Sequence, residues 1–77
     1  MNAKVGQVVW VRDPSHHSYM MWCAAYFVRT EQHRHAPYLV EYARPGMGRQ
    51  PGGICGYFPQ MRLDAPPKTE QERRVWA

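Results

Sequence analysis

The chain is poor in cysteine, in acidic residues and in long apolar runs, and each shortage excludes a class of protein. Two cysteines, Cys23 and Cys55, form at most one disulfide, which excludes a framework of several disulfides. No apolar segment has the length of a membrane span or the pattern of a signal peptide. We therefore expect a cytoplasmic protein with reduced thiols and no membrane partner.

Motifs for catalysis are also missing. The six acidic residues are scattered, no serine, histidine and acid are spaced as a triad, and no Gly-x-x-x-x-Gly-Lys segment offers a phosphate cradle. Four histidines, at positions 16, 17, 33 and 35, lie in expected loops, and no Cys-x-x-Cys pair accompanies them. These absences disfavour an enzyme, and we expect solvated histidines, no metal site and no cofactor.

The length and the charge of the chain bear on its partners. A chain of 77 residues forms one domain, and folding buries only about 60% of the surface that such a short unfolded chain exposes. A core this thin favours self-association. Ten Lys and Arg against six Asp and Glu give a net charge of +4, which favours polyanions or acidic surfaces as partners.

Five short segments have the pattern of β-strands. Four of them contain β-branched or aromatic residues, are separated by turn residues and span residues 7–12, 22–29, 38–42 and 54–58. Residues 60–63, after Pro59, are expected to form a tight turn and a short closing strand. We therefore predict an all-β fold, a small five-stranded, partly open barrel of the SH3-like kind over residues 1–65. Its core is expected to hold Val9, Val11, Ala25, Phe27, Val40 and Leu63.

Two segments differ in composition from these strands. Residues 44–53 carry four glycines and two prolines, which predicts an exposed loop rather than regular structure. Residues 66–77 form a tail in which Thr69 and Glu72 have the spacing of a capping box. We predict a short C-terminal helix that starts there and ends near Trp76.

The order of a few residues resembles the Tudor and Agenet modules, which are SH3-like barrels. Gly6 stands before the first strand, Trp22 with a small residue after it opens the second, and Tyr38-x-Val40 lies in the third. This similarity covers roughly residues 5–64. Because each motif is short, the resemblance implies a fold more than a ligand.

The chain also resembles the plasmid-borne type II dihydrofolate reductases. It is similar in length, in residues 38–41 (Tyr-Leu-Val-Glu) and in residues 58–64 (Phe-Pro-Gln-Met-Arg-Leu-Asp). In that family four copies surround one pore, where a glutamine and a tyrosine bind nicotinamide cofactor and folate. Here the glutamine position falls on Gly56 and the tyrosine position on Phe58. The resemblance therefore implies an oligomeric pore for a nucleotide-like small molecule, without the reductase activity.

Aromatic residues are more numerous than a core of this size can hold, since the chain has three tryptophans, five tyrosines and two phenylalanines. Surface aromatics beside arginines suit base stacking and phosphate binding. They equally suit a cage for a methylated ammonium or an interface between identical chains. The candidate ligand-binding residues are Trp10, Arg12, Trp22, Tyr26, Arg29, Tyr42, Arg44, Arg49 and Tyr57.

These observations give one leading hypothesis and one alternative. The first is a non-enzymatic binding module that contacts nucleic acid or a protein partner through its basic, aromatic surface and forms a homo-oligomer. The alternative is the oligomeric pore that the reductase resemblance implies.

Overall fold

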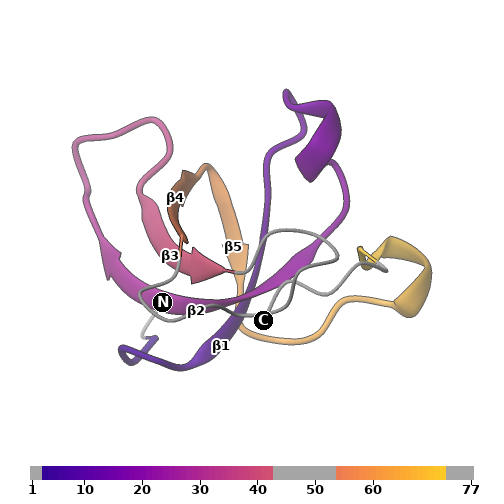
Figure 1. Ribbon diagram of the computed structural model, residues 1–77, viewed down its shortest axis with the longest axis horizontal. Helices are drawn as coiled ribbons and strands as arrows, with labels where there is room; N and C mark the ends of the chain where they lie inside the picture. The colour runs from indigo at the N-terminus through magenta and orange to yellow at the C-terminus, as the bar shows by residue number, and fades with distance from the viewer. Residues whose placement is uncertain (1–2, 43–53, 73–77) are drawn as a thin grey trace.

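The computed structural model describes residues 3–42 and 54–72 of the chain, and these form one antiparallel sheet of five strands (Figure 1). The strands are β1 (Val8–Arg12), β2 (Cys23–Thr30), β3 (Tyr38–Tyr42), β4 (Ile54–Phe58) and β5 (Gln60–Arg62). Their order across the sheet is β4-β3-β2-β1-β5. The sheet bends strongly, and its two edge strands meet at Pro59. The predicted all-β class and small barrel are confirmed, with the third and fourth strands at the expected positions.

The inner face of the bent sheet forms the core. Its buried side chains are Val9, Val11, Cys23, Ala25, Phe27, Val40, Tyr42, Phe58 and Met61. The core prediction is thus confirmed except at Leu63, which is half-buried and packs against this cluster. Leu63 follows the last residue of β5, where the chain leaves the sheet, so one side of its side chain has no strand beside it.

A register shift between β2 and β3 changes the outer face. The pairing runs from Phe27 opposite Val40 to Arg29 opposite Leu39, which leaves one extra residue, Val28, in β2. Such a bulge increases the local twist of the sheet. Leu39 then lies on the outer face between Arg29 of β2 and Tyr57 of β4. It is buried although it does not belong to the core cluster.

The predicted C-terminal helix is wrong over the described residues. Only a 3-10 turn, η2 (Lys68–Glu70), forms there; it follows Pro67, and Thr69 lies inside the turn and not at its cap. At Gln71 the backbone is extended and forms a parallel bridge with Trp22. A single helical turn is only marginally stable in water. The extended backbone at Gln71 instead allows two hydrogen bonds between the tail and Trp22. The remainder of the expected helix, residues 73–77, lies outside the described residues.

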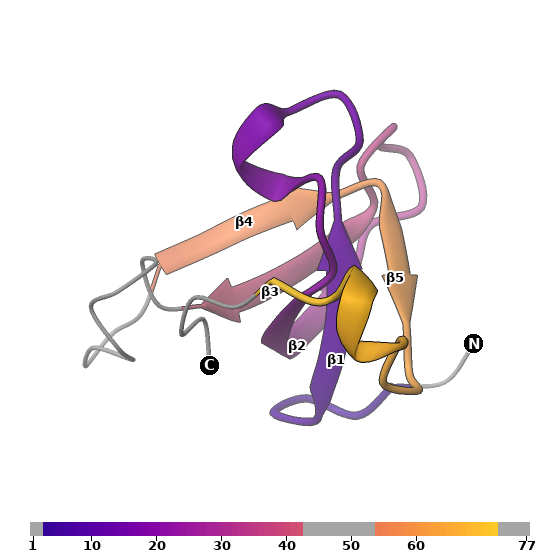
Figure 2. The same cartoon turned by 90° about the vertical axis from the view of Figure 1, so that its right-hand side faces the viewer.

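Two backbone hydrogen bonds attach this tail to the barrel. The Trp22 amide donates to the Glu70 carbonyl at 2.9 Å, and the Glu72 amide donates to the Trp22 carbonyl at 2.8 Å. Figure 2 shows η2 on the outside of the sheet, on the side of β1 and β5. The second 3-10 turn, η1 (His17–Tyr19), lies in the connection from β1 to β2. No helix in the described ranges is long and apolar enough to cross a membrane.

Candidate nucleic-acid interface

The outer face of the sheet collects most of the predicted site residues. Because side chains alternate along a strand, those of Trp10, Arg12, Tyr26 and Tyr57 point to the face opposite the core. Trp22 and Arg29 lie on the same outer side, just before β2 and after its bulge. Tyr42 instead points into the core. Arg44 and Arg49 lie outside the described residues.

Arg12, Trp22 and Arg62 form a cluster on this face, which we call the arginine–tryptophan cluster. The guanidinium carbon of Arg12 lies 4.7 Å from the centre of the Trp22 ring, and that of Arg62 lies 5.7 Å from it. The Nε of Arg12 also donates to Oε1 of Gln60 at 2.5 Å. Trp22 is only 8% exposed, so its ring supports both guanidinium groups and is not itself an open stacking surface.

Among the described residues, the two guanidinium groups of this cluster have no acidic partner. All six acidic residues of the chain belong to the described part, and within that part the one salt bridge joins Arg29 to Glu31. A guanidinium remains charged at every physiological pH. The cluster therefore presents two uncompensated positive charges whose positions are held by the tryptophan ring and by Gln60.

Trp10 lies next to this cluster. Its cross-strand neighbours are Arg62 on β5 and Ala24 on β2, and its side chain is half-buried. Part of the Trp10 side chain therefore remains exposed to solvent. A half-buried aromatic side chain thus stands beside two arginines that have no acidic partner among the described residues.

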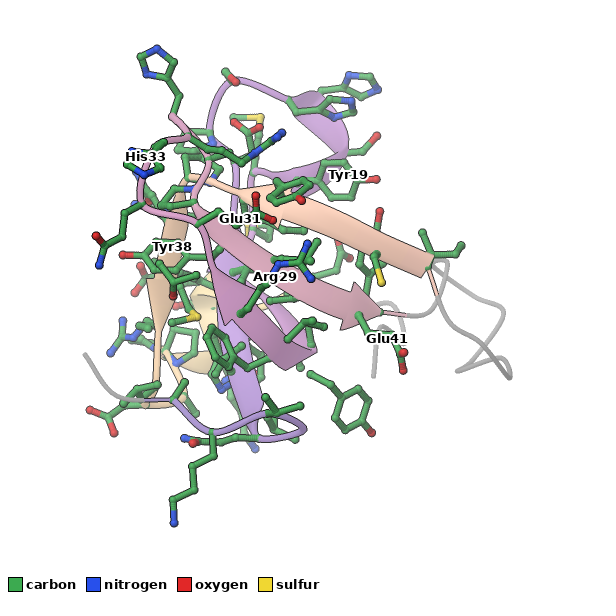
Figure 3. The ribbon with its side chains drawn as sticks, turned by 90° about the vertical axis from the view of Figure 1, so that its left-hand side faces the viewer. Tyr19, Arg29, Glu31, His33, Tyr38 and Glu41 are labelled. Carbon is green, nitrogen blue, oxygen red and sulfur yellow. The ribbon has the colours of Figure 1, made fainter. Side chains whose placement is uncertain are left out.

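A second group of charged and aromatic side chains lies over β3 and β4. The Tyr57 hydroxyl donates to Oε2 of Glu31 at 2.5 Å, and Nε of Arg29 donates to the same oxygen at 3.0 Å. Figure 3 shows Arg29 and Glu31 close together beside β3. The guanidinium of Arg34 stacks on Tyr57, 3.6 Å from the ring centre. We call Arg29, Glu31, Arg34 and Tyr57 the loop clamp, because they attach the β2–β3 connection to β4.

The titration of the loop clamp follows from these contacts. The hydrogen bond from Tyr57 is the largest effect and lowers the pKa of the Glu31 carboxyl; burial opposes it, and the hydrogen bond and charge of Arg29 lower this pKa further. The hydrogen bond and the charge of Glu31 raise the pKa of Arg29. Glu31 already satisfies Arg29, so this clamp offers less uncompensated charge than the arginine–tryptophan cluster does.

Three aromatic rings at one end of the barrel bear on the methylated-ammonium hypothesis. The ring centres of Tyr19, Tyr42 and Phe58 are 5.3 to 6.3 Å apart, and the rings meet edge to face. At these separations aromatic rings are in direct contact. Tyr42 and Phe58 are also buried, which corrects the expectation that Tyr42 faces a ligand. The rings fill the space that a cage would leave open for a cation.

Gly56, the position of the pore glutamine in the reductase resemblance, faces the same rings. A Cβ atom added at Gly56 would lie 2.9 Å from Cε1 of Tyr42 and 3.5 Å from Cε1 of Phe58. Real side chains do not approach that closely, so Tyr42 would have to move before any side chain could stand at position 56. Packing against Tyr42 within one chain therefore explains why position 56 carries a glycine.

The histidines and cysteines form no ligand set in the described ranges. His16 and His17 stack with their ring centres 5.3 Å apart, and Nδ1 of His16 accepts a hydrogen bond from the Ser18 amide at 3.2 Å. Among the described residues, no three side chains of His, Cys, Asp or Glu come together as metal ligands would. Cys23 is buried and Cys55 exposed, and no disulfide joins them.

Comparison with known proteins adds no relative, since no family model, no curated protein and no solved structure was found to match the chain. Sequence reasoning missed Arg62 and Arg34 as members of the two clusters on the outer face. A period-2 pattern for the closing strand would have placed Arg62 on the outer face, whereas no pattern indicates that Arg34 reaches Tyr57.

Proposed function

We propose that this protein is a nucleic-acid-binding module that holds phosphate groups at the arginine–tryptophan cluster. One observation carries the proposal: Arg12 and Arg62 lie against one tryptophan ring without an acidic partner in the described part of the chain. Two charges of the same sign side by side repel each other. An anion bound between them removes that repulsion.

The geometry of the arginines favours phosphate as this anion. A guanidinium that rests on an aromatic ring keeps its N–H edge directed outward, where it can donate two parallel hydrogen bonds to a phosphate. The net charge of +4 adds a long-range attraction to a polyanion. A nucleic acid combines this charge with bases that can stack beside the arginines.

The experiment is a titration of a labelled oligonucleotide with the native protein and with Arg12→Gln and Arg62→Gln. If each arginine binds one phosphate, the native affinity falls with salt at a log–log slope of about −1.4 on a single strand or about −1.8 on a duplex. Each substitution reduces the size of that slope by about half. Lys4→Gln is the matched control, because Lys4 is exposed and precedes the opposite end of β1. A substitution that changes neither the affinity nor the slope contradicts the proposal.

A protein contact is the second candidate, and one feature of β4 favours it. This strand is an edge of the sheet, hydrogen-bonded to β3 alone within the described part of the chain. Its five residues carry no charge, although edge strands are usually protected by charges, prolines or bulges. A second copy of the chain could add its own β4 here, which would make the module a homo-oligomer.

A further inference from the structure

We infer that the nucleic acid bound at this face is a single strand, with one base stacked on Trp10. The inference rests on the proposed function and specifies its ligand. It has two independent supports: the placement of Trp10 beside the arginine–tryptophan cluster, and the absence from the described residues of any element that reads a duplex.

The first support is the spacing of these side chains. Trp10 and Arg62 are direct cross-strand partners, which places their Cβ atoms about 4.5 to 5.5 Å apart. Arg12 follows Trp10 by two residues on the same face of β1, a step of about 7 Å along the strand. One nucleotide can therefore place its base on the indole while its flanking phosphates reach the two arginines.

The partial exposure of the Trp10 side chain also belongs to this first support. The Trp10 side chain is half-buried, so part of it remains exposed to solvent. Trp22 is only 8% exposed and its ring carries both arginines, so it cannot serve the same purpose. A half-buried ring also loses little conformational freedom when a base stacks on it, since the sheet already holds it. Trp10 is thus the ring on which we place the base.

The second support is the shape of the described fold. The major groove of a duplex admits an α-helix or a separate two-stranded ribbon. The described ranges contain no α-helix, and every strand in them belongs to one bent sheet. The bases of a duplex are stacked on each other and hidden from a flat protein surface, whereas those of a single strand are free to stack on an aromatic side chain.

The test compares one mixed-sequence oligonucleotide, about 12 nucleotides long to suit the usual site sizes of small barrels, as a single strand and as a duplex. Binding is followed by fluorescence anisotropy at low salt with the native protein, Trp10→Leu and Trp10→Phe. We expect the single strand to bind more tightly than the duplex. Trp10→Leu should lose about 5- to 150-fold in affinity, the usual range for one stacked base, and Trp10→Phe should keep most of the native affinity.

Tyr19→Leu is the matched control, because Tyr19 is a half-buried aromatic of the β1–β2 connection that packs on the core side. It should bind the single strand as the native protein does. Should Trp10→Leu fail to fold, the indole N–H resonance of Trp10 in the native protein replaces it and must shift when the single strand is added.

The failures of the two proposals are distinguishable. Equal or tighter binding of the duplex overturns the single-strand inference and leaves the nucleic-acid function standing. Single-strand binding that Trp10→Leu does not weaken, or that leaves the indole resonance unchanged, overturns the role of Trp10. If neither form binds at low salt, the proposed function and the inference fall together.

Discussion

The ring of Tyr42 occupies the space that a side chain at position 56 would need. An added Cβ at Gly56 would lie 2.9 Å from Cε1 and 3.3 Å from the hydroxyl oxygen of Tyr42. Tyr42 is only 9% exposed and contacts Phe58 and Tyr19 edge to face. The ring has little freedom to withdraw, so the glycine in β4 and the tyrosine in β3 depend on each other.

The first prediction follows from this pair. Gly56→Ala should lower the free energy of unfolding by about 1 to 3 kcal/mol, the usual effect of an inserted group in a packed core. Thermal or urea unfolding measures it. Cys55→Ala is the control, because Cys55 is exposed on the other face of the same strand. Adding Tyr42→Leu should reduce the effect of Gly56→Ala, since the smaller side chain leaves room. Strictly additive effects would contradict the contact.

The second prediction concerns the pH dependence that Glu31 confers. In the folded protein the Tyr57 hydrogen bond and Arg29 lower its pKa below the ordinary value of 4.5. The folded state therefore binds fewer protons there than the unfolded state. The stabilisation that ionised Glu31 gives to the folded protein is complete above pH 4.5. It is lost as the pH falls through the pKa that Glu31 has in the folded state.

Tyr57→Phe tests this linkage, because it removes the hydroxyl that donates to Glu31. We expect the variant to be less stable than the native protein at pH 7, with the difference shrinking below pH 4.5. NMR titration of the Glu31 carboxyl should show a higher pKa in Tyr57→Phe. Tyr38→Phe is the control, since Tyr38 lies in β3 and its hydroxyl does not donate to Glu31, which accepts from Tyr57. If the difference in stability between Tyr57→Phe and the native protein does not change with pH, the proposed effect of Tyr57 on the pKa of Glu31 is contradicted.

The third prediction concerns self-association through β4. If two copies pair along this edge, a contact related by a two-fold axis uses each residue twice. Cys55→Lys would then place two charges at the junction, on a side chain that is exposed in the single chain. We expect light scattering to show at least a dimer for the native protein at about 100 µM, where a contact tighter than about −6 kcal/mol would be populated. Cys55→Lys should give a smaller species with an unchanged β-sheet circular dichroism spectrum. A native monomer at that concentration would exclude this interface.

Local pattern in the sequence was sufficient for much of the fold. Residues 38–42 and 54–58 form strands at the predicted positions. The alternation along residues 38–42, and Pro59 as the stop after residues 54–58, act over a few residues and need no distant partner. The same alternation identified Val9, Val11 and Val40 as core residues. Arginine next to aromatic residues also indicated the outer face, and Arg12 and Trp22 do lie in contact.

Only the tertiary structure decided which of these residues meet. Residues at 66–72 carry a helix signal, yet Gln71 is extended because it bonds to Trp22, far away in the chain. The bulge after Phe27 set the register that places Leu39 between Arg29 and Tyr57. Sequence reasoning placed Tyr42 at a ligand surface, but Gly56 on the neighbouring strand leaves room for its ring inside the barrel.

For the arginine–tryptophan cluster too, the sequence predicted the kinds of residue at the surface, and the tertiary structure decided which of them are in contact. The sequence by itself determined that its ten aromatic residues exceed what the core of a small barrel can hold, so that some of them lie on the surface. That Arg12 and Arg62 share one ring depends on the pairing of β1 with β5, whose partners are about fifty residues apart. Pairing between distant strands reflects the balance of loop entropy, burial and register over the whole chain, and no local pattern encodes that balance.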